Sequence, residues 1–449
     1  MSYIPYKNYS PSKTYLLDEI PSNWEIIPMN QFVELVTDYV SNGSFASLRT
    51  NVEYKNEEDF AILVRLADNS NNFAGPFVYI NEDAYNFLSK SKLFEGDIVL
   101  SNTGSIGSIF KVPNLGKPMS LAPNSLLIRF RNQTLADYFF YLFSCDIGRK
   151  FLESITTVTT QPKFNKTDFR KLPMLMPPLK EQKQIANYLD KKTAKIDENI
   201  SKNKKLIELL EEKRTALINE VVTKGLNPDV PMKDSGIEWI GEIPEHWEVV
   251  LFKRLFNLIK DGTHGSFERV DDGEPLLSAK NIFNDKINIS KTESCISKDD
   301  FLSIVSNGFP KKDDLLMTIV GTIGRSCVYD KEFPLAFQRS VSFIRLTHDN
   351  PYYYNYFIKS QIFQSQLLIR AKQSAQKGVY LNDIKECLVI RPPFETQIEI
   401  AKYLQNRITK INETILKIQE NINLLKEYKT SLIHHVVTGK IDVRGEQIE

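Results

Sequence analysis

The segment RPPF at residues 391–394 superficially resembles a catalytic motif, the Asn/Asp-Pro-Pro-aromatic signature of enzymes that methylate amino groups. However, Arg391 replaces the carbonyl oxygen that would accept a hydrogen bond from the target amine. A second copy of the segment, at 176–179, reads MPPL. Two prolines ahead of a helix are better explained as the exit of a strand followed by the start of the helix.

Other signatures of catalysis or metal binding are incomplete. The glycine segments NTGSIGS (102–108) and VGTIGRS (320–326) lack the full dinucleotide fingerprint and the lysine of a phosphate loop, and are more typical of hairpin turns. Histidines 246, 264, 348, 434 and 435 lack metal-ligand spacing, and Cys145, Cys295, Cys327 and Cys387 form no zinc or redox pair. No nucleophile, base and orienting acid can be assembled. We therefore expect no catalytic residue, no metal site and no cofactor in this chain.

The 57 basic and 56 acidic residues of the 449-residue chain nearly cancel. A protein that coats nucleic acid nonspecifically is usually far more basic, because neutralised phosphates supply most of that affinity. Any DNA binding must therefore come from local patches or from the help of another subunit. The chain lacks an apolar stretch of about 20 residues and a signal peptide. These features predict a cytoplasmic protein without a membrane partner.

The sequence contains an internal repeat that spans most of the chain. Residues 172–192, LPMLMPPLKEQKQIANYLDKK, match residues 387–407, CLVIRPPFETQIEIAKYLQNR, at an offset of 215. Upstream, IPSNWEIIPM (20–29) matches IPEHWEVVLF (243–252), and the tripeptide GSF occurs at 43–45 and 265–267. Because an internal repeat decides the architecture, we predict two pseudo-symmetric α/β (α+β) domains, each followed by a long helix.

Alternating spacings of four and three residues place apolar side chains on one face of both long helices, which is typical of a coiled-coil seam. Thr193, Asn203, Arg214 and Lys429 interrupt the seam, and a buried Asn203 would fix the register at some cost in stability. Helices of roughly 60 Å are too long for one domain to cover, so we expect them to pair with each other, antiparallel because of the two-fold relation. The predicted seam consists of Leu189, Ile196, Ile200, Ile207, Leu210, Leu217, Val221, Leu404, Ile408, Ile411, Ile415, Ile418, Ile422, Leu425, Leu432 and Val436.

The globular parts read as mixed strands and helices. GDIVLSNTGSIGSIFKV (96–112) and DLLMTIVGTIGRSCVY (314–329) are predicted hairpins, and LLIRF (126–130) and VSFIRL (341–346) are predicted central strands. The aromatic-rich segments that follow these strands are predicted core helices. The predicted boundaries are an N-terminal segment 1–19, a first domain 20–172, a first long helix 173–225, a linker 226–242, a second domain 243–388, and a second long helix with the C-terminal tail 389–449.

Two further segments carry a family resemblance. These are the linker KDSGIEWIGEIPEHWEV (233–249) and the stretch KDGTHGSF (260–267), which is followed by LLSAKNI (276–282). With the two Pro-Pro-x-x-x-Gln helix starts and the doubled plan, they resemble the specificity subunit of type I restriction-modification systems. The resemblance covers essentially the whole chain. In one respect the chain departs from it, because the first domain has TDYVSNGSF (37–45) where the second has KDGTHGSF.

The resemblance implies a non-catalytic subunit with two target recognition domains. Each would read one half of a bipartite site in double-stranded DNA, and the two helices would form an antiparallel coiled coil that sets the spacer. It also implies partners, namely two methyltransferase (M) subunits that carry S-adenosylmethionine and restriction/translocase (R) subunits that use ATP and Mg. Two alternatives remain open at this point: a self-contained DNA methyltransferase or nuclease with diverged motifs, and a coiled-coil scaffold that binds only protein.

The expected DNA contacts are polar residues in loops between predicted strands. Asn and Gln suit adenine, and Arg or Lys suit guanine, whereas contacts to phosphate fix the register. In the first domain the candidates are Asn42, Ser44, Arg49, Asn102, Thr103, Thr159, Gln161, Lys163 and Asn165. In the second domain they are Lys260, Thr263, His264, Lys280, Asn281, Arg325, Gln338, Arg339, Gln373, Gln376 and Lys377.

Overall fold

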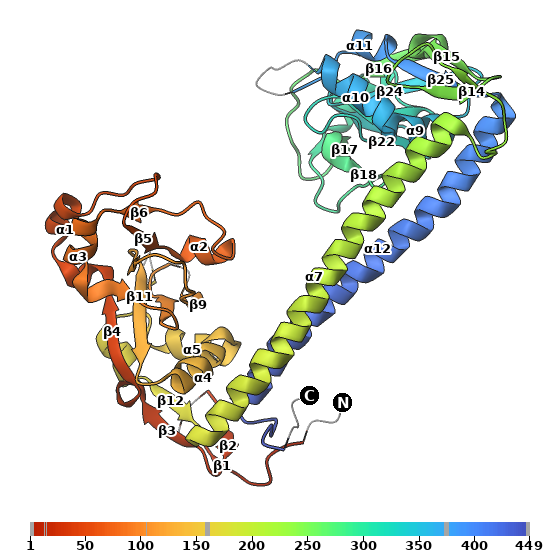
Figure 1. Ribbon diagram of the computed structural model, residues 1–449. Helices are drawn as coiled ribbons and strands as arrows, with labels where there is room; N and C mark the ends of the chain where they lie inside the picture. Colours follow the sequence, from red (N-terminus) through yellow and green to blue (C-terminus); the bar gives the residue numbers. More distant parts are fainter. Residues whose placement is uncertain are drawn as a thin grey trace. The chain divides into compact units, whose positions relative to one another are not determined.

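The computed structural model describes residues 4–12, 14, 16–104, 106–157, 162–371 and 377–445 (Figure 1). The chain divides into two compact units. One contains Met1–Lys202 and Glu420–Glu449, and the other contains Asn203–Gln419. Each unit therefore contains one globular domain and a part of both long helices, α7 (Leu179–Lys224) and α12 (Phe394–Val437).

The two long helices run antiparallel within each unit. In the first unit, Lys429 Nζ lies 2.6 and 2.7 Å from the Asp197 carboxylate, and Gln184 Nε2 donates to the carbonyl of Arg444, beyond the end of α12. In the second unit, Arg214 Nη1 donates to Asn412 Oδ1 at 2.9 Å. At the repeat offset of 215, Asp197 corresponds to Asn412 and Arg214 corresponds to Lys429. The two polar pairs therefore occupy equivalent positions in the two halves of the repeat.

The burial of the helices follows the predicted seam. Every predicted seam residue is buried or half-buried, whereas most neighbours on α7 and α12 are exposed. Of the polar interruptions, Thr193 is buried, whereas Asn203 is half-buried. The prediction of two pseudo-symmetric domains with an antiparallel helix pair is therefore confirmed.

Each long helix begins just after a strand, with only two prolines between them. Strand β12 (Pro173–Met176) pairs with β3 (Glu25–Pro28), and β25 (Leu388–Arg391) pairs with β15 (Glu248–Leu251). Gln182 Nε2 then donates to the carbonyl of Pro177 at 2.7 Å, and Gln397 Nε2 donates to that of Pro392 at 2.9 Å. The glutamine of the Pro-Pro-x-x-x-Gln motif thus folds back to cap the carbonyl in front of the helix. The interpretation of RPPF as a strand exit and helix start is confirmed.

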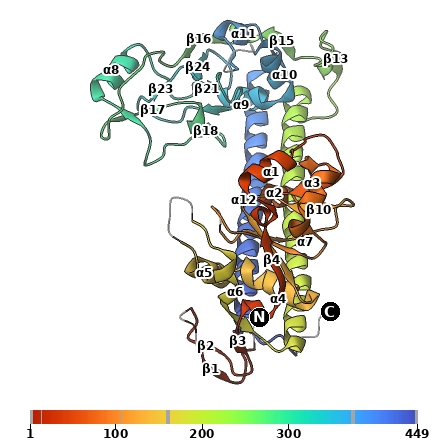
Figure 2. The same ribbon diagram turned by 90° about the vertical axis from the view of Figure 1, so that its left-hand side faces the viewer.

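The first domain contains two four-stranded sheets. The antiparallel sheet has the order β4-β11-β8-β9, and the second sheet has the order β6-β5-β10-β7, with β5 and β10 parallel. Figure 2 gives a second view, in which β4 of the first sheet and β10 of the second are labelled. The predicted hairpin is β8–β9, and the predicted central strand is β11. The strands are β1 Tyr9–Pro11, β2 Glu19–Pro21, β4 Val33–Asp38, β5 Ala61–Val64, β6 Tyr79–Ile80, β7 Lys92–Leu93, β8 Ile98–Ser101, β9 Ile109–Lys111, β10 Met119–Leu121 and β11 Ser125–Phe130; the helices are α1 Phe45–Asn51, α2 Leu66–Ser70, α3 Glu82–Phe87, α4 Gln133–Ser144, α5 Asp146–Ser154 and α6 Lys166–Lys171, with short 3-10 turns η1 Met29–Gln31, η2 Tyr39–Asn42 and η3 Ser89–Ser91.

The second domain repeats the antiparallel sheet in the order β16-β24-β21-β22, beside a three-stranded sheet β20-β17-β23 in which β17 and β23 are parallel. The hairpin β21–β22 and the central strand β24 are as predicted. The strands are β13 Met232–Asp234, β14 Glu242–Pro244, β16 Phe256–Asp261, β17 Glu274–Leu277, β18 Ile282–Phe283, β19 Lys286–Ile287, β20 Cys295–Ile296, β21 Leu315–Thr318, β22 Ser326–Val328, β23 Ala336–Phe337 and β24 Val341–Leu346; the helices are α8 Lys298–Ser306, α9 Pro351–Lys359, α10 Gln361–Arg370 and α11 Leu381–Lys385, with 3-10 turns η4 Phe252–Arg254 and η5 Ala279–Asn281.

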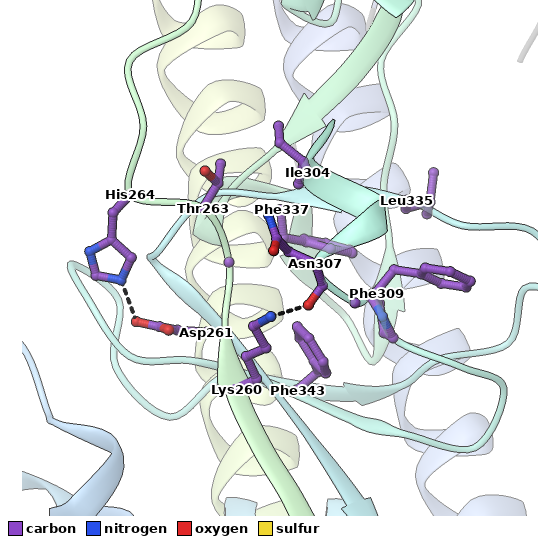
Figure 3. A pocket seen from close by; sticks show the side chains of 13 residues that line it. Lys260, Asp261, Thr263, His264, Ile304, Asn307, Phe309, Leu335, Phe337 and Phe343 are labelled. Carbon is purple, nitrogen blue, oxygen red and sulfur yellow. Dashed lines mark hydrogen bonds and ion pairs between the residues drawn. The ribbon is translucent and has the colours of Figure 1, made fainter. Parts of the chain in front are cut away.

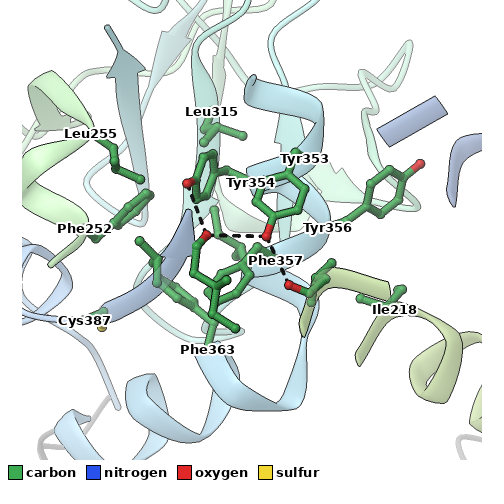
Figure 4. Packing of buried hydrophobic residues seen from close by; sticks show 14 of the residues in the cluster. Ile218, Phe252, Leu255, Leu315, Tyr353, Tyr354, Tyr356, Phe357, Phe363 and Cys387 are labelled. Atoms are coloured by element: carbon green, nitrogen blue, oxygen red, sulfur yellow. Dashed lines mark hydrogen bonds between the residues drawn. The ribbon is translucent and has the colours of Figure 1, made fainter. Parts of the chain in front are cut away.

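The aromatic residues of α9 are core residues, as predicted. Tyr353, Tyr354 and Phe357 are fully buried and pack with Phe252 and Phe363 (Figure 4). Tyr353 Oη donates to the carbonyls of Val222 on α7 and Ile390 on β25. The core of the second domain is therefore continuous with the end of one long helix and with the strand that leads into the other. Within the described ranges, no helix is both long and apolar enough to cross a membrane.

A buried carboxylate at the start of α7 joins the N-terminal segment to the first domain. Glu181 is 3% exposed. It accepts hydrogen bonds from Trp24 Nε1 at 2.8 Å, Asn23 Nδ2 at 2.9 Å and the hydroxyl of Tyr6. Burial and Glu181 raise the pKa of Tyr6 far above its ordinary value, so this hydroxyl remains a donor. The first turn of a helix also favours a negative charge.

We expect Glu181→Ala to destabilise the first unit by about 2 to 6 kcal/mol, because the Tyr6 and Trp24 donors would each be buried without an acceptor, at about 1 to 3 kcal/mol each. The measurement is the urea midpoint followed by tryptophan fluorescence. Glu198→Ala is the matched control on the same helix, since the Glu198 carboxylate is exposed and pairs with the exposed Lys202; its midpoint should stay unchanged. Equal midpoints for both variants would contradict the role of Glu181.

Candidate nucleic-acid interface

In each domain, several loops meet at one edge of the antiparallel sheet. In the first domain, Leu126 of β11 lies opposite Asp38, the last residue of β4, and Ser125 lies opposite Ser101, the last residue of β8. The segments that follow β4 and β8 and the segment that precedes β11 therefore share this edge. In the second domain, Val341 at the start of β24 lies opposite Thr318, the last residue of β21, while Ser342 lies opposite Asp261 of β16.

The glycine segments after β8 and β21 are tied to a chain segment ahead of α6 or α11. The amide of Gly104 donates to the carbonyl of Pro162, and the amide of Gly321 donates to that of Lys377, both at 3.1 Å. Gly104 and Gly321 have φ angles of 75° and 80°, which favour glycine. These segments are hairpin turns, as predicted, and each one brings a second segment to the same sheet edge.

A hollow of about 800 Å³ lies at this edge in the first domain. It is bordered by β4, α1, the turn after β8 and the segment ahead of α6. The predicted contacts that the structure brings together in it are Arg49, Asn102, Thr103, Lys163 and Asn165. Arg49 and Lys163 form no ion pair within the part of the chain that the structure describes.

Several first-domain candidates have local structural partners. Among those in the hollow, Asn165 caps α6 by accepting from the amide of Asp168 at 2.8 Å, and Asn102 Nδ2 donates to the carbonyl of Phe164 at 3.4 Å. The side chain of Asn42 donates to Ser91 Oγ at 2.8 Å and to the carbonyl of Tyr39, and accepts from the amide of Lys90. Ser44 caps α1 by accepting from the amide of Ser47. Thr159 and Gln161 lie outside the described residues.

In the second domain, a smaller pocket of about 240 Å³ lies between the end of β16 and the residues that follow α8 (Figure 3). Unlike the hollow of the first domain, its lining does not include the turn after β21 or the segment ahead of α11. Its lining includes the predicted contacts Lys260, Thr263 and His264, with Phe337 and Phe343 at its apolar side. The ammonium of Lys260 bonds the carbonyl of Asn307. The lining combines the apolar residues Ile304, Phe309, Pro310, Leu335, Phe337 and Phe343 with the polar residues at the end of β16. Among these, the Thr263 hydroxyl accepts from the amide of Gly265 at 3.2 Å, while His264 bonds Asp261.

The aspartate of the Asp-Gly-Thr-His element has an equivalent in the first domain. His264 Nε2 lies 2.8 Å from Asp261 Oδ2. Asp38, also at the end of the first strand of its sheet, accepts from Ser41 Oγ at 2.6 Å and pairs with Lys166 Nζ at 2.9 Å. The two aspartates thus have the same place in the fold, while a hydroxyl and an ammonium group replace the imidazole. The sequence alone did not point to Lys166.

The remaining second-domain candidates fall into two groups. Asn281 is only 3% exposed, and its side chain bonds Glu293, the carbonyl of Asn288 and the amide of Ser278. Lys280 pairs with Glu293 at 2.6 Å. Burial alone would raise the pKa of Glu293, but the hydrogen bonds from Lys280 and Asn281 outweigh it and lower that pKa. A base contact by Asn281 would require this network to open. Arg325, Arg339 and Lys377 are exposed and Gln338 is half-buried, whereas Gln373 and Gln376 lie outside the described residues.

Comparison with known proteins identifies the family. The profile of the Type I restriction modification DNA specificity domain matches residues 21–210 and 244–424, which is most of the chain and once for each half. The chain belongs to this family. The family domain is a DNA-recognition domain, and its members are non-catalytic subunits of type I restriction-modification systems.

Full-length relatives have the same extent. The MjaVIII specificity subunit of Methanocaldococcus jannaschii is 27% identical over 439 residues, which is 95% of each chain. The EcoBI specificity subunit of Escherichia coli is 26% identical over 239 residues, about half of each chain. Half-length matching of this kind is expected when two domains diverge independently.

Solved structures share the fold. A chain from a study of complex assembly and conformational transition in a type I R-M system superposes with a TM-score of 0.68 at 15% identity, covering 94% of this chain and 99% of that chain. The HsdS subunit of Thermoanaerobacter tengcongensis gives a TM-score of 0.50 at 14% identity, covering 94% of this chain and 98% of that chain. Among the described residues of this specificity subunit, no group of His, Cys, Asp and Glu side chains could hold a metal ion.

We expect Asn281→Ala to loosen the second domain by about 1 to 3 kcal/mol, because the Glu293 carboxylate and neighbouring backbone groups would lose a buried partner. Amide hydrogen exchange should become faster in β17, β18 and β19. Arg339→Ala, at an exposed site close by in the fold, should leave exchange unchanged. If Asn281→Ala weakened DNA binding with no change in exchange, Asn281 would be a contact residue instead.

Proposed function

We propose that this specificity subunit reads a bipartite site in double-stranded DNA, one half-site per domain. The observation that carries the proposal is the repetition of one arrangement: each domain presents the same set of loops at the same edge of the same antiparallel sheet. A protein that read one continuous site would not need two copies of this edge. The domain boundaries 20–172 and 243–388 are part of the proposal.

The residues at these edges suit the chemistry of base reading. In the first domain, Asn102 offers the donor and acceptor that match adenine, while Arg49 and Lys163 suit guanine or phosphate. In the second domain, the exposed Arg325 and Arg339 can serve the same purpose, and Lys377 suits phosphate. Candidates with internal partners, such as Asn42 and Asn281, are the weaker members of each set.

The antiparallel helices are proposed to set the distance between the two half-sites. A coiled coil acts as a ruler only if its register cannot slip, because a one-residue slip moves a helix by about 1.5 Å. The half-buried pair of Arg214 with Asn412 opposes such a slip, since displacement would leave a charge and an amide unpaired in the seam. Lys429, half-buried at the other seam position, would likewise lose its partner Asp197, which is itself exposed.

The proposed partners are two methyltransferase subunits with S-adenosylmethionine and restriction/translocase subunits with ATP and Mg, in the cytoplasm. The near-zero net charge of +1 supports this assembly, because a chain with few excess cations gains little affinity from phosphate neutralisation alone. The subunit would therefore supply the discrimination between sequences, and the assembly would supply the remaining affinity and all of the chemistry.

Mapping methylated adenines across a genome that expresses the complex tests the proposal. Two short constant blocks separated by a fixed spacer are expected, and replacing residues 20–170 with the domain of a relative should change only one block. A change in both blocks would contradict the modular reading. Methylation by this chain alone would support a self-contained enzyme, and a complex without sequence preference would support a protein-only scaffold.

Inserting one helical turn after Leu210, alone or with a compensating turn in α12, should change the accepted spacer and leave the half-site bases intact. One turn adds about 5.4 Å, which exceeds the roughly 3.4 Å rise of a base pair. By the Arg214–Asn412 pairing, Leu210 lies four residues before Arg214, so the compensating position is four residues after Asn412, at Leu416.

The matched control is an insertion of equal length after Asn227 in the exposed linker. This variant should keep the original spacer, because the linker is not part of the helix seam. Altered half-site bases in the α7 variant, or an altered spacer in the linker variant, would refute the division of labour between domains and helices.

A further inference from the structure

The tripeptide GSF, repeated in the two domains, has two different structures. In the second domain, Phe267 is half-buried against the cluster that contains Leu276 and Ile296, and a Cβ placed on Gly265 would come within 2.8 Å of its ring. In the first domain, Phe45 is the first residue of α1 and is 83% exposed. The same three residues therefore bury a phenylalanine in one domain and expose it in the other.

The exposure of Phe45 breaks the pattern of its own helix. Leu48 and Val52 lie one and two turns further along on the same face, and both are buried in the cluster around Ala61 and Leu63. The face that buries these two side chains extends past them to Phe45, which the described residues of the domain leave 83% exposed. A large apolar side chain left uncovered on a face that is otherwise buried indicates a contact outside the chain.

The surroundings of Phe45 indicate what it contacts. Phe45 lines the same hollow as Arg49, Asn102 and Lys163. Val40 and Tyr54, which are 44% and 53% exposed, add apolar surface to the rim. The Tyr54 hydroxyl donates to the Tyr39 hydroxyl at 3.3 Å, which holds its ring at the rim. The hollow thus combines cations, an amide and an aromatic surface in one concave site.

We infer that Phe45 is a specificity-determining residue of the first domain that packs against the 5-methyl group of a thymine in the major groove; this rests on the proposed DNA-reading function. The major groove presents that methyl group beside the donors and acceptors that Asn102 and Arg49 can read, and it is the one apolar group on a base edge. The minor groove has no such group. Val40 and the ring of Tyr54 form the apolar surroundings of the contact, and Lys163 complements a neighbouring phosphate.

The GSF segment of the second domain offers less apolar surface for such a contact, because Phe267 is half-buried against its own domain. In that domain the place after the shared aspartate is filled by His264 and Thr263, which are polar. The two domains therefore read their half-sites with different chemistry on the same backbone plan, and the first half-site contains a thymine whose methyl group is required.

The test uses the full chain in complex with its methyltransferase subunits and duplexes that carry the mapped site. Each thymine of the first half-site is replaced in turn by uracil, which removes only the methyl group. One position should weaken binding about fourfold, the value for burial of one methyl-sized group. In Phe45→Ala, binding should be weaker overall and the thymine and uracil duplexes should bind equally, while Phe45→Leu should keep part of the difference.

The control is Phe60→Ala, a partly exposed phenylalanine of the same domain that packs on Tyr85 and does not line the hollow; it should retain the wild-type uracil effect. Hydrogen exchange of α1 verifies that Phe45→Ala remains folded. The inference is overturned if no thymine position is sensitive, or if the uracil effect persists in Phe45→Ala. It is also overturned if 2-aminopurine fluorescence rises at the half-site without a uracil effect, since Phe45 would then be a wedge between bases.

These outcomes are distinct from failure of the proposed function. Loss of all sequence preference in the wild-type complex would overturn DNA reading itself. If the complex still prefers the mapped site but binds the thymine and uracil duplexes equally, only the assignment of Phe45 would be overturned.

Discussion

The direct connection between the last strand of each domain and a long helix is the constraint on which the rest of each unit depends. Pro177 and Pro392 end their strands, and Gln182 and Gln397 return to bond the proline carbonyls. Because only two prolines intervene, the register of β12 with β3, and of β25 with β15, fixes the direction in which each helix leaves. With a flexible connection, the helix seam could still form, but the orientation of each domain relative to its helix would not be fixed.

Each domain is also attached to the end of the other long helix. Gly439 follows α12 and Gly225 follows α7, with φ angles of 73° and 79° that suit a helix terminus. A Cβ on Gly439 would collide with Pro21, and a Cβ on Gly225 would lie 3.1 Å from the ring of Trp247. Within each unit, the domain therefore contacts the start of one helix and the end of the other. Two separate contacts restrict the rotation of the domain about the helices more than either contact would alone.

The sequence predicted those features that depend on periodicity or on local chemistry. The seam, the hairpins, the central strands and the Pro-Pro helix starts are of this kind, and the repeat supplied the plan of the whole chain. The interior position of Asn281, the Asp38–Lys166 pair and the exposure of Phe45 could not be predicted, because each depends on which distant segment covers a loop. Lys166 is far from Asp38 in the sequence, and identical GSF tripeptides diverge because Ser44 caps a helix whereas Phe267 folds back over Gly265.

The near-neutral charge of this specificity subunit has a physical consequence for discrimination. Contacts to phosphate strengthen binding to every sequence alike, so each added cation raises the affinity for wrong sites as much as for the right one. A chain that keeps few unpaired cations at its sheet edges, such as Arg49 and Lys163, leaves the difference between sites to base edges and methyl groups. Apolar contacts serve this purpose well, because they gain nothing from phosphate and are lost when a single methyl group is absent. On this argument, an exposed phenylalanine among a few cations increases selectivity more than further cations would.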